Sequence, residues 1–271
     1  MDLLNEGDRW PGTNAWIHPV QRRRAVNVRL ICLPYAGGST QHFRTWPEEL
    51  PPSVEVCSVE LPGRNARLKE PPFTQFDPLV RAIAKAILPC LNVPFALFGH
   101  SMGALIAFEL GRLLARKHRL EPVHLFVAGS QAPQLPDPYP PLHALPEPEF
   151  KAELRRLNGT PAEILDNPEM MQLVSPILRA DLEVSETYAY RPRPRLNCPI
   201  TAFGGLGERI GRDLLDPWQH HTSSTFDIRM LPGGHFFVHT AKHLLLRIIS
   251  RELRKCAPMA EGRNPERAGE R

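Results

Sequence analysis

Long hydrophobic runs are missing from this sequence. Its 271 residues are 42% hydrophobic, which is enough for a sizeable core. Yet no segment approaches the roughly 20 continuous apolar residues of a membrane-spanning helix. The first residues include Asp2, Glu6 and Asp8 and no apolar segment of the kind that a secretory signal contains. We therefore expect neither a membrane span nor a signal peptide.

Cysteine is scarce and does not occur in pairs. The sequence has 5 cysteines, and they are widely scattered: Cys32, Cys57, Cys90, Cys198 and Cys256. Disulfide frameworks and zinc sites need paired or closely spaced cysteines, so we expect neither of them and no metal site. Three of the cysteines lie within or beside apolar runs, as buried thiols do. This usage favours a reducing compartment, and we expect a cytoplasmic protein.

Neither the basic nor the acidic residues are clustered in a pattern that indicates a binding site. The formal net charge is +4, with 33 Lys and Arg against 29 Asp and Glu. Much of the excess lies in residues 251–271 and in the run Arg22, Arg23 and Arg24. A nucleic-acid-binding face combines clustered basic residues with aromatic residues that stack on bases, and no such cluster occurs here. A solvated charged surface explains the charges better, so no nucleic-acid partner is expected.

What the sequence does contain is an alternation of strand and helix patterns. After an irregular arm at residues 1–24, short apolar runs bounded by Gly and Pro recur between stretches with helical spacing. This order predicts an α/β fold with a mostly parallel central sheet and helices on both faces. The predicted strands are residues 26–33, 54–61, 95–98, 123–128, 199–203 and 226–231. We expect one domain over residues 25–255, closed by a helix at 240–254, and a disordered tail at 256–271.

The alternation stops between about residues 131 and 195. A proline-rich segment opens this region, and helical stretches follow at residues 150–157 and 168–188. Loops at the carboxyl ends of parallel strands build the site in open α/β sheets. A helical insertion at such a position is therefore predicted to be a lid over the site. The alternative, a linker to a second domain, is disfavoured because the strand pattern resumes afterwards.

The most informative motif is Gly-His-Ser-Met-Gly at residues 99–103. An apolar strand pattern precedes it and a helical pattern follows it, which is the context of a nucleophile elbow in the α/β-hydrolase fold. The glycines would allow strand and helix to approach closely, and Ser101 would stand at the apex with its hydroxyl exposed. The alternative is a glycine-rich turn with an incidental serine. The flanking patterns favour the nucleophile.

A serine nucleophile needs a base and an acid, which follow it in that fold in the order Ser, acid, His. His235 lies just beyond the last strand in a Gly-Gly loop and is the predicted base, whereas the other downstream histidines have packing or surface interpretations. The acid should lie in the loop after residues 199–203. Glu208 is the first carboxylate there, and Asp213 is the alternative.

The oxyanion that forms during acyl transfer needs two backbone N–H donors. One comes from the residue after the nucleophile, here Met102. The other comes from the loop after an early strand, and Ala36 in the segment Pro-Tyr-Ala-Gly-Gly is the candidate. The alternative for this loop is an ordinary tight turn.

Taken together, these motifs resemble a type II thioesterase, the free-standing editing enzyme of polyketide synthases and nonribosomal peptide synthetases. The segments that carry the resemblance occur in family order at residues 33–39, 61–64, 98–103, 178–181 and 231–237. The resemblance assigns Ser101 as nucleophile and His235 as base. The family usually has Asp where this chain has Glu208, and Trp218 keeps a family-like position that supports aligning Glu208 there.

The resemblance also implies a substrate and a mechanism. The substrate would be an acyl thioester on the phosphopantetheine arm of an acyl or peptidyl carrier protein, hydrolysed through an acyl-serine intermediate. The enzyme would be a monomer and would need no metal or diffusible cofactor. Two alternatives stay open: a carboxylester hydrolase that acts on small soluble esters, and a catalytically weakened protein that only binds the synthase.

Overall fold

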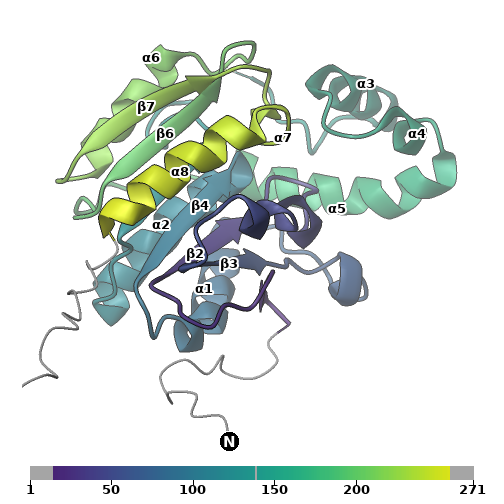
Figure 1. The fold of residues 1–271 in the computed structure, drawn as a ribbon. Coiled ribbons are helices and arrows are strands. Elements are labelled where there is room, and N and C mark those ends of the chain that lie inside the picture. Colours follow the sequence, from purple (N-terminus) through teal and green to yellow (C-terminus); the bar gives the residue numbers. More distant parts are fainter. Residues whose placement is uncertain (1–14, 138, 257–271) are drawn as a thin grey trace, which may run out of the picture.

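Seven strands form one sheet at the centre of the molecule (Figure 1). The computed structural model describes residues 15–137 and 139–256. The strand order is β1-β3-β2-β4-β5-β6-β7, and all neighbouring pairs are parallel except β1 with β3. The strands are β1 (Ile17–Pro19), β2 (Val28–Leu33), β3 (Val54–Val59), β4 (Phe95–His100), β5 (His124–Ala128), β6 (Ile200–Gly205) and β7 (Phe226–Leu231). The predicted α/β fold with a mostly parallel sheet is confirmed.

The first strand corrects the expectation of an irregular arm over residues 1–24. Ile17–Pro19 pairs antiparallel with β3, and the Ile17 side chain is fully buried. A three-residue strand with one apolar side chain has no periodicity of its own, so only its pairing with β3 defines it. The earlier residues of the predicted arm and the predicted tail beyond residue 256 lie outside the described residues.

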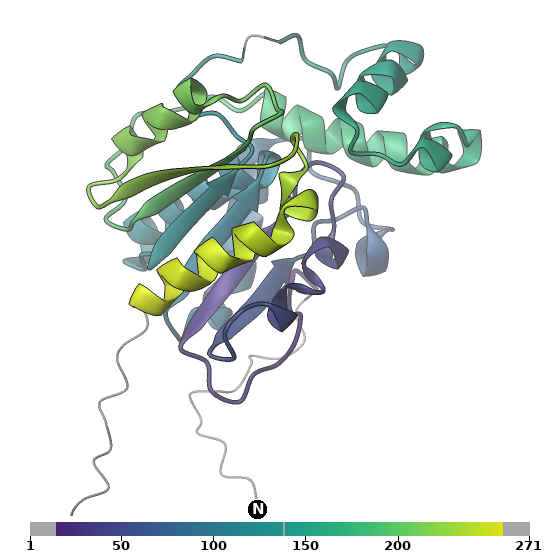
Figure 2. The same ribbon diagram turned by 45° about the horizontal axis from the view of Figure 1, so that its top comes forward.

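Helices cover both faces of the sheet, because successive residues of the central strands face opposite sides and both sides are apolar. On one face, Ile31 and Leu33 pack with α1 (Phe76–Ile87) and α2 (Met102–His118). On the other, Leu30 and Cys32 share a core with α8 (Lys242–Cys256). Figures 1 and 2 show α8 lying across the front of the sheet and α1 and α2 behind it. Four cysteines are buried free thiols: Cys32, Cys57, Cys90 and Cys198.

The start of α1 differs from what local sequence predicts. Asp77 followed by Pro78 is typical of an N-cap and first helical residue. In the structure the helix begins at Phe76, with Gln75 as N-cap and no side-chain capping bond. Phe76 is buried and its ring packs against Tyr188 at a centroid distance of 4.5 Å. This tertiary contact favours a helix that begins at Phe76. Asp77 then lies in the first turn, near the positive end of the helix dipole.

The region between β5 and β6 forms the predicted helical insertion. It contains α3 (Glu147–Leu157), α4 (Ala162–Leu165) and α5 (Pro168–Glu186), which project from one end of the sheet (Figure 2). The projecting helices have a small core of their own, made of Phe150, Leu154, Leu165, Met171 and Leu178. Pro176 interrupts the interior of α5. Val184, further along the same helix, joins the main core, so α5 connects the insertion to the sheet domain.

Among the described residues, no helix is long and apolar enough to span a membrane.

A buried histidine in β5 makes the stability of the fold depend on pH. His124 Nε2 lies 2.8 Å from Thr201 Oγ1, and the imidazole stacks on Phe126 at a centroid distance of 4.1 Å. Burial lowers the pKa of His124 from 6.5 to about 4. The unfolded chain therefore binds a proton between these pH values that the folded chain does not bind. Stability from this group is complete above pH 6.5 and declines as the pH falls toward 4.

We expect His124 alone to lower the free energy of unfolding by about 2 kcal/mol between pH 7 and pH 5. Urea denaturation at both pH values would measure it in the wild type and in His124→Gln, whose side chain does not titrate. The variant should lose less stability over this interval than the wild type. Equal losses in the two proteins would contradict the prediction.

Candidate functional site

Ser101 occupies a sharp turn between β4 and α2. Its φ and ψ are 54° and −119°, a conformation that non-glycine residues rarely adopt. The flanking glycines make the turn possible: a Cβ at Gly99 would lie 1.9 Å from the Gly103 carbonyl oxygen, and a Cβ at Gly103 would lie 2.3 Å from the Leu33 carbonyl oxygen. The strand, the turn and the helix are those of the predicted elbow, and the serine side chain is partly exposed at its apex.

His235 follows β7 and is hydrogen-bonded to Glu208. The His235 Nδ1 atom lies 2.9 Å from Glu208 Oε2, and the Glu208 side chain is only 2% exposed. The other carboxylate oxygen, Oε1, accepts a hydrogen bond of 2.6 Å from the Gly205 N–H. A carboxylate at Nδ1 holds the proton on that nitrogen and leaves Nε2 free to accept one. The pair therefore has the arrangement of a general base and its orienting acid.

Two glycine-rich loops bring this pair together. The Gly207 N–H donates to the Gly233 carbonyl at 2.8 Å, and a Cβ at Gly205 would lie 2.5 Å from the Gly234 carbonyl oxygen. The close approach of these backbones brings Glu208 within reach of His235. Asp213, the alternative acid, lies instead in the short helix α6 (Arg212–Leu215) and has no hydrogen bond to His235 among the described residues.

His100, the residue before Ser101, ties the elbow to the loop of His235. Its Nε2–H donates to the His235 carbonyl at 2.9 Å, and the two rings lie 4.9 Å apart between centroids. Burial lowers the pKa of His100 well below its ordinary value, so the ring is neutral. Gly129 lies against both imidazole rings and leaves room for them because it has no side chain. A Cβ there would lie 2.8 Å from His100 Nε2 and 3.2 Å from His235 Cε1. The elbow and the histidine loop are therefore in direct contact.

The segment after β2 forms a tight turn beside the elbow. The Gly38 N–H donates to the Tyr35 carbonyl at 2.8 Å, and Gly37 takes the positive φ of 76° that such a turn requires at its third residue. Within the described residues, the N–H groups of Ala36 in this turn and of Met102 at the start of α2 donate to no protein group. The two predicted oxyanion donors thus have no protein acceptor among the described residues.

An aromatic cluster borders this turn, and local sequence patterns did not predict it. The Tyr35 hydroxyl lies 3.1 Å from Nε2 of both His42 and His239. Burial lowers the pKa of His42 to about 4 and lowers that of His239 below its ordinary value. Both imidazoles are therefore neutral near pH 7, and the hydroxyl can donate to one and accept from the other. Phe236, next to His235, packs its ring on Tyr35 at a centroid distance of 5.0 Å.

A second polar cluster reaches the same turn from the insertion. Asp181 of α5 pairs with Arg64 through contacts of 2.8 Å from both guanidinium NH groups, and one of its oxygens also accepts the Gly37 N–H at 2.7 Å. Both side chains are buried, 7% exposed for Arg64 and 4% for Asp181. The two residues belong to motifs at 61–64 and 178–181 whose role the sequence left unassigned.

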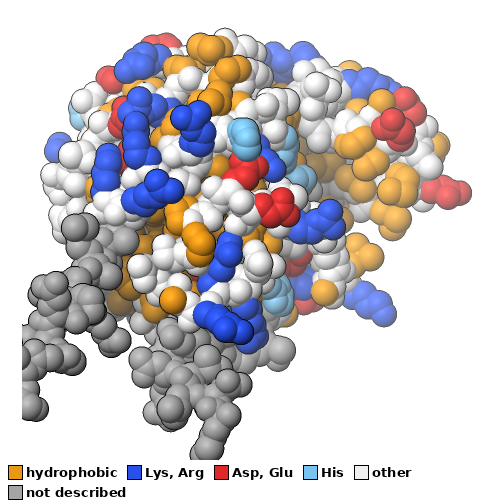
Figure 3. Space-filling model, viewed as in Figure 1, with side chains coloured by type: hydrophobic (Ala, Val, Ile, Leu, Met, Phe, Trp, Pro, Cys, Tyr) orange, Lys and Arg blue, Asp and Glu red, His pale blue; other side chains and the backbone are white. Residues whose placement is uncertain are grey.

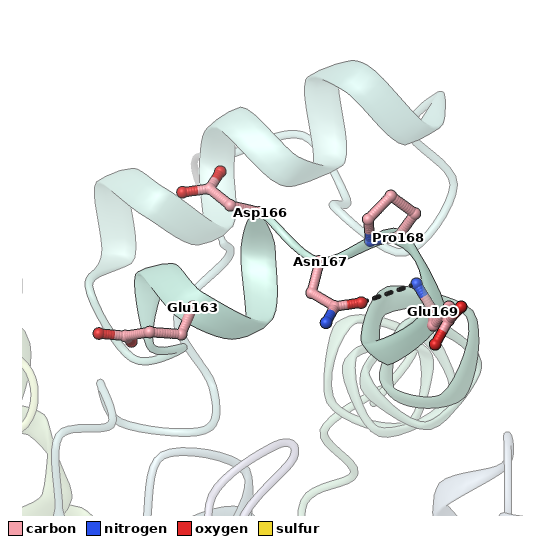
Figure 4. Close-up of a pocket in the computed structure, with 5 residues that line it drawn as sticks. All are labelled: Glu163, Asp166, Asn167, Pro168 and Glu169. Atoms are coloured by element: carbon pink, nitrogen blue, oxygen red, sulfur yellow. Dashed lines mark hydrogen bonds between the residues drawn. The ribbon is translucent and has the colours of Figure 1, made fainter.

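The described surface also has an acidic hollow, located where α4 meets α5 (Figure 4). It is an open depression lined by Glu163, Asp166, Asn167, Pro168 and Glu169. Asn167 caps α5 by accepting from the Glu169 N–H at 3.0 Å, and Asp166 pairs with an arginine of α3. No group of three possible metal ligands occurs among the described residues. The residues that line the hollow include no serine, cysteine or histidine.

The chain is similar to known proteins along most of its length. The model of a family described as "Thioesterase domain" matches residues 28–253. The chain is 43% identical over 242 residues to the gramicidin S biosynthesis protein GrsT of Aneurinibacillus migulanus, covering 89% of this chain and 94% of that protein.

Two solved structures share the fold. The RedJ thioesterase of the prodiginine pathway in Streptomyces coelicolor is 39% identical, with a TM-score of 0.79, over 84% of this chain and 86% of that one. The type II thioesterase BorB of the borrelidin cluster is 33% identical, with a TM-score of 0.82, over 90% of this chain and 100% of that one. The predicted α/β-hydrolase fold and the resemblance noted in the sequence are confirmed.

Proposed function

The chain belongs to the thioesterase family, and we propose that it is a type II thioesterase that removes acyl groups from the carrier proteins of a polyketide or nonribosomal peptide synthase. The observation that carries the proposal is the His235–Glu208 hydrogen bond of 2.9 Å next to the strained Ser101. The similarity to the thioesterases RedJ and BorB, which covers 86% and 100% of those chains, supports it. It is an enzyme of the serine hydrolase type.

In this proposal Ser101, His235 and Glu208 form the catalytic triad. His235 Nε2 accepts the proton of the Ser101 hydroxyl as its oxygen attacks the thioester carbonyl, and Glu208 stabilises the imidazolium that forms. The carbonyl oxygen becomes an oxyanion held by the N–H groups of Ala36 and Met102. The carbon–sulfur bond then breaks, and His235 returns the proton to the departing thiolate. Water, deprotonated by His235, attacks the acyl-serine and releases the free acid.

The insertion is proposed to act as the lid that admits the phosphopantetheine arm. Its helices project beyond the sheet, and hydrophobic side chains gather on their surface (Figure 3). Met170 and Leu173 of α5 are among the exposed apolar residues. An apolar surface of this kind suits a flexible arm that carries an acyl chain. Carrier domains are accordingly the proposed partners, and no cofactor takes part in the mechanism.

The two alternative functions, a carboxylester hydrolase and a protein that only binds the synthase, require different features of the site. A carboxylester hydrolase would use the same triad, so only substrate preference separates it from a thioesterase. A protein that merely binds the synthase would not need an ordered acid. The buried Glu208, bonded to both His235 and Gly205, therefore argues for a working triad despite the replacement of the usual Asp.

Substrate preference tests the proposal directly. Hydrolysis of an acetylated carrier protein, of acetyl-phosphopantetheine alone and of p-nitrophenyl acetate would be compared by kcat/KM, with the unacylated carrier protein as a competitor. We expect the carrier-bound thioester to be hydrolysed fastest, because binding of the carrier contributes to transition-state stabilisation. Hydrolysis of the aryl ester as fast as the carrier thioester would instead indicate a general esterase.

A further inference from the structure

The tight turn at residues 35–38, which carries the Ala36 N–H and is called the oxyanion turn from here on, is held from two sides. On one side Gly103 of α2 packs directly against the backbone of Leu33 and Pro34. On the other, the Gly37 N–H donates to Asp181 at 2.7 Å, and the Arg64 guanidinium donates to the Gly38 carbonyl at 2.8 Å. The Arg64–Asp181 ion pair thus bonds to one N–H and one carbonyl of the same turn.

The side chains of α5 reinforce this connection. Leu178 and Asp181 lie three residues apart and therefore on one face of the helix. A Cβ on Gly37 would lie 2.3 Å from Leu178 Cδ2, so the helix packs against the turn with no space between them. The helix α5 and the turn that carries Ala36 are therefore joined by the ion pair and by close packing.

We propose that Asp181 and Arg64 are positioning residues for the oxyanion hole, and that through them the docking of the lid helix sets the orientation of the Ala36 N–H. This inference rests on the proposed function. Its physical basis is the conformational freedom of a β-turn, whose central peptide can rotate at small cost between two common turn types. That rotation would reverse the direction of the Gly37 N–H. The bond to Asp181 holds the Ala36–Gly37 peptide in one orientation and so fixes the backbone torsions next to the Ala36 N–H.

The burial of the ion pair gives this arrangement its rigidity. A buried charge that loses its partner is strongly unfavourable, so neither Arg64 nor Asp181 can leave the cluster alone. Arg64 also donates to the Pro62 carbonyl at 3.3 Å, which anchors it to the loop after β3. An oxyanion donor that is out of place by a fraction of an ångström loses much of its effect, because the charge develops only in the transition state.

Three variants of the full chain test the proposal. Arg64→Lys keeps the positive charge but removes the bidentate hydrogen bond to Asp181. Asp181→Asn removes the negative charge of the carboxylate. The double variant Arg64→Met with Asp181→Leu removes both charges together, a change that buried ion pairs often tolerate without loss of stability. The readouts are kcat and KM for p-nitrophenyl acetate and for acetyl-phosphopantetheine. The inhibition constant of an alkylboronic acid, which forms a tetrahedral anion on Ser101, is also measured.

We expect kcat to fall about 10- to 100-fold in each variant while KM changes less than about twofold. The boronic acid should bind more weakly by a similar factor, because it occupies the same oxyanion site as the transition state. The double variant is decisive, since it should fold normally and still lack the acceptor for the Gly37 N–H.

A matched control lies in the same sheet. Arg29 and Glu55 form another buried ion pair, with a contact of 2.7 Å, near the amino ends of β2 and β3 and so away from the elbow. Glu55→Gln should lower the melting temperature and leave kcat and boronic acid binding unchanged. Unchanged kcat in the double variant, or an equal loss in Glu55→Gln, would overturn the proposal. A wild-type protein that cleaves the aryl ester but not the thioester would contradict the proposed function alone, because both substrates use the same oxyanion site.

Discussion

Ser101→Ala is expected to lower kcat by about 10⁴- to 10⁶-fold for thioester and ester substrates alike. The methyl group cannot form the acyl intermediate, and the oxyanion donors that remain give only residual catalysis. The fold should be unaffected, since alanine adopts the positive φ of this turn at the same cost as serine. Quenched time-point assays with an acylated carrier protein would measure the loss of turnover. Mass spectrometry would detect the trapped acyl-enzyme in the wild type and its absence in Ser101→Ala.

Ser130→Ala provides the control for this experiment. Ser130 is a small polar residue close to the site, since it follows Gly129, but it is buried, and among the described residues its hydroxyl donates to the neighbouring Gln131 carbonyl at 3.3 Å. This variant should retain kcat within about twofold, as is usual away from catalytic contacts. Turnover by Ser101→Ala at more than a tenth of the wild-type rate would show that another group is the nucleophile.

Glu208→Gln is expected to lower kcat by about 10³- to 10⁴-fold. The two oxygens of Glu208 accept hydrogen bonds from two different groups, the Gly205 N–H and His235 Nδ1. A glutamine has only one acceptor oxygen to share between them. When that oxygen serves Gly205, the amide NH₂ faces His235 and drives its proton from Nδ1 to Nε2, where the ring can no longer accept the serine proton.

Asp213→Asn is the matched comparison, because Asp213 was the other acid that the sequence allowed. In the structure it lies in α6, and its variant should keep kcat within about twofold. Steady-state kinetics of both variants between pH 6 and 9 would identify the acid. A larger loss in Asp213→Asn than in Glu208→Gln would reverse the assignment.

Local signals in the sequence were sufficient for the elbow and for most of the sheet. The spacing of Gly99 and Gly103 around Ser101 predicts a strand, a turn and a helix because only residues without side chains permit that approach. The apolar strand patterns located the parallel strands to within a few residues. The helical insertion was also predicted, since its helices interrupt an otherwise regular alternation.

Features that depend on distant segments could not be predicted in the same way. The sequence favours Glu208 but leaves Asp213 as an alternative acid, because only the contact between two glycine loops decides which carboxylate reaches His235. The Tyr35, His42 and His239 cluster joins three separate segments. Strand β1 exists through its pairing with β3 alone. In each case the determining interaction joins residues that no local period relates.

Pro176 leaves a gap in the hydrogen bonding of α5, and side-chain contacts span that gap. Proline has no N–H, so the helical hydrogen bond from residue 176 to the carbonyl four residues earlier is missing from the middle of α5. Arg179, just beyond Pro176, donates to the His143 and Leu145 carbonyls at 2.7 Å and to Glu147 Oε2 at 2.9 Å. These contacts fasten the start of α3 to the half of α5 that carries Asp181. The insertion is thus braced at the turn where the main chain of its long helix lacks a hydrogen bond.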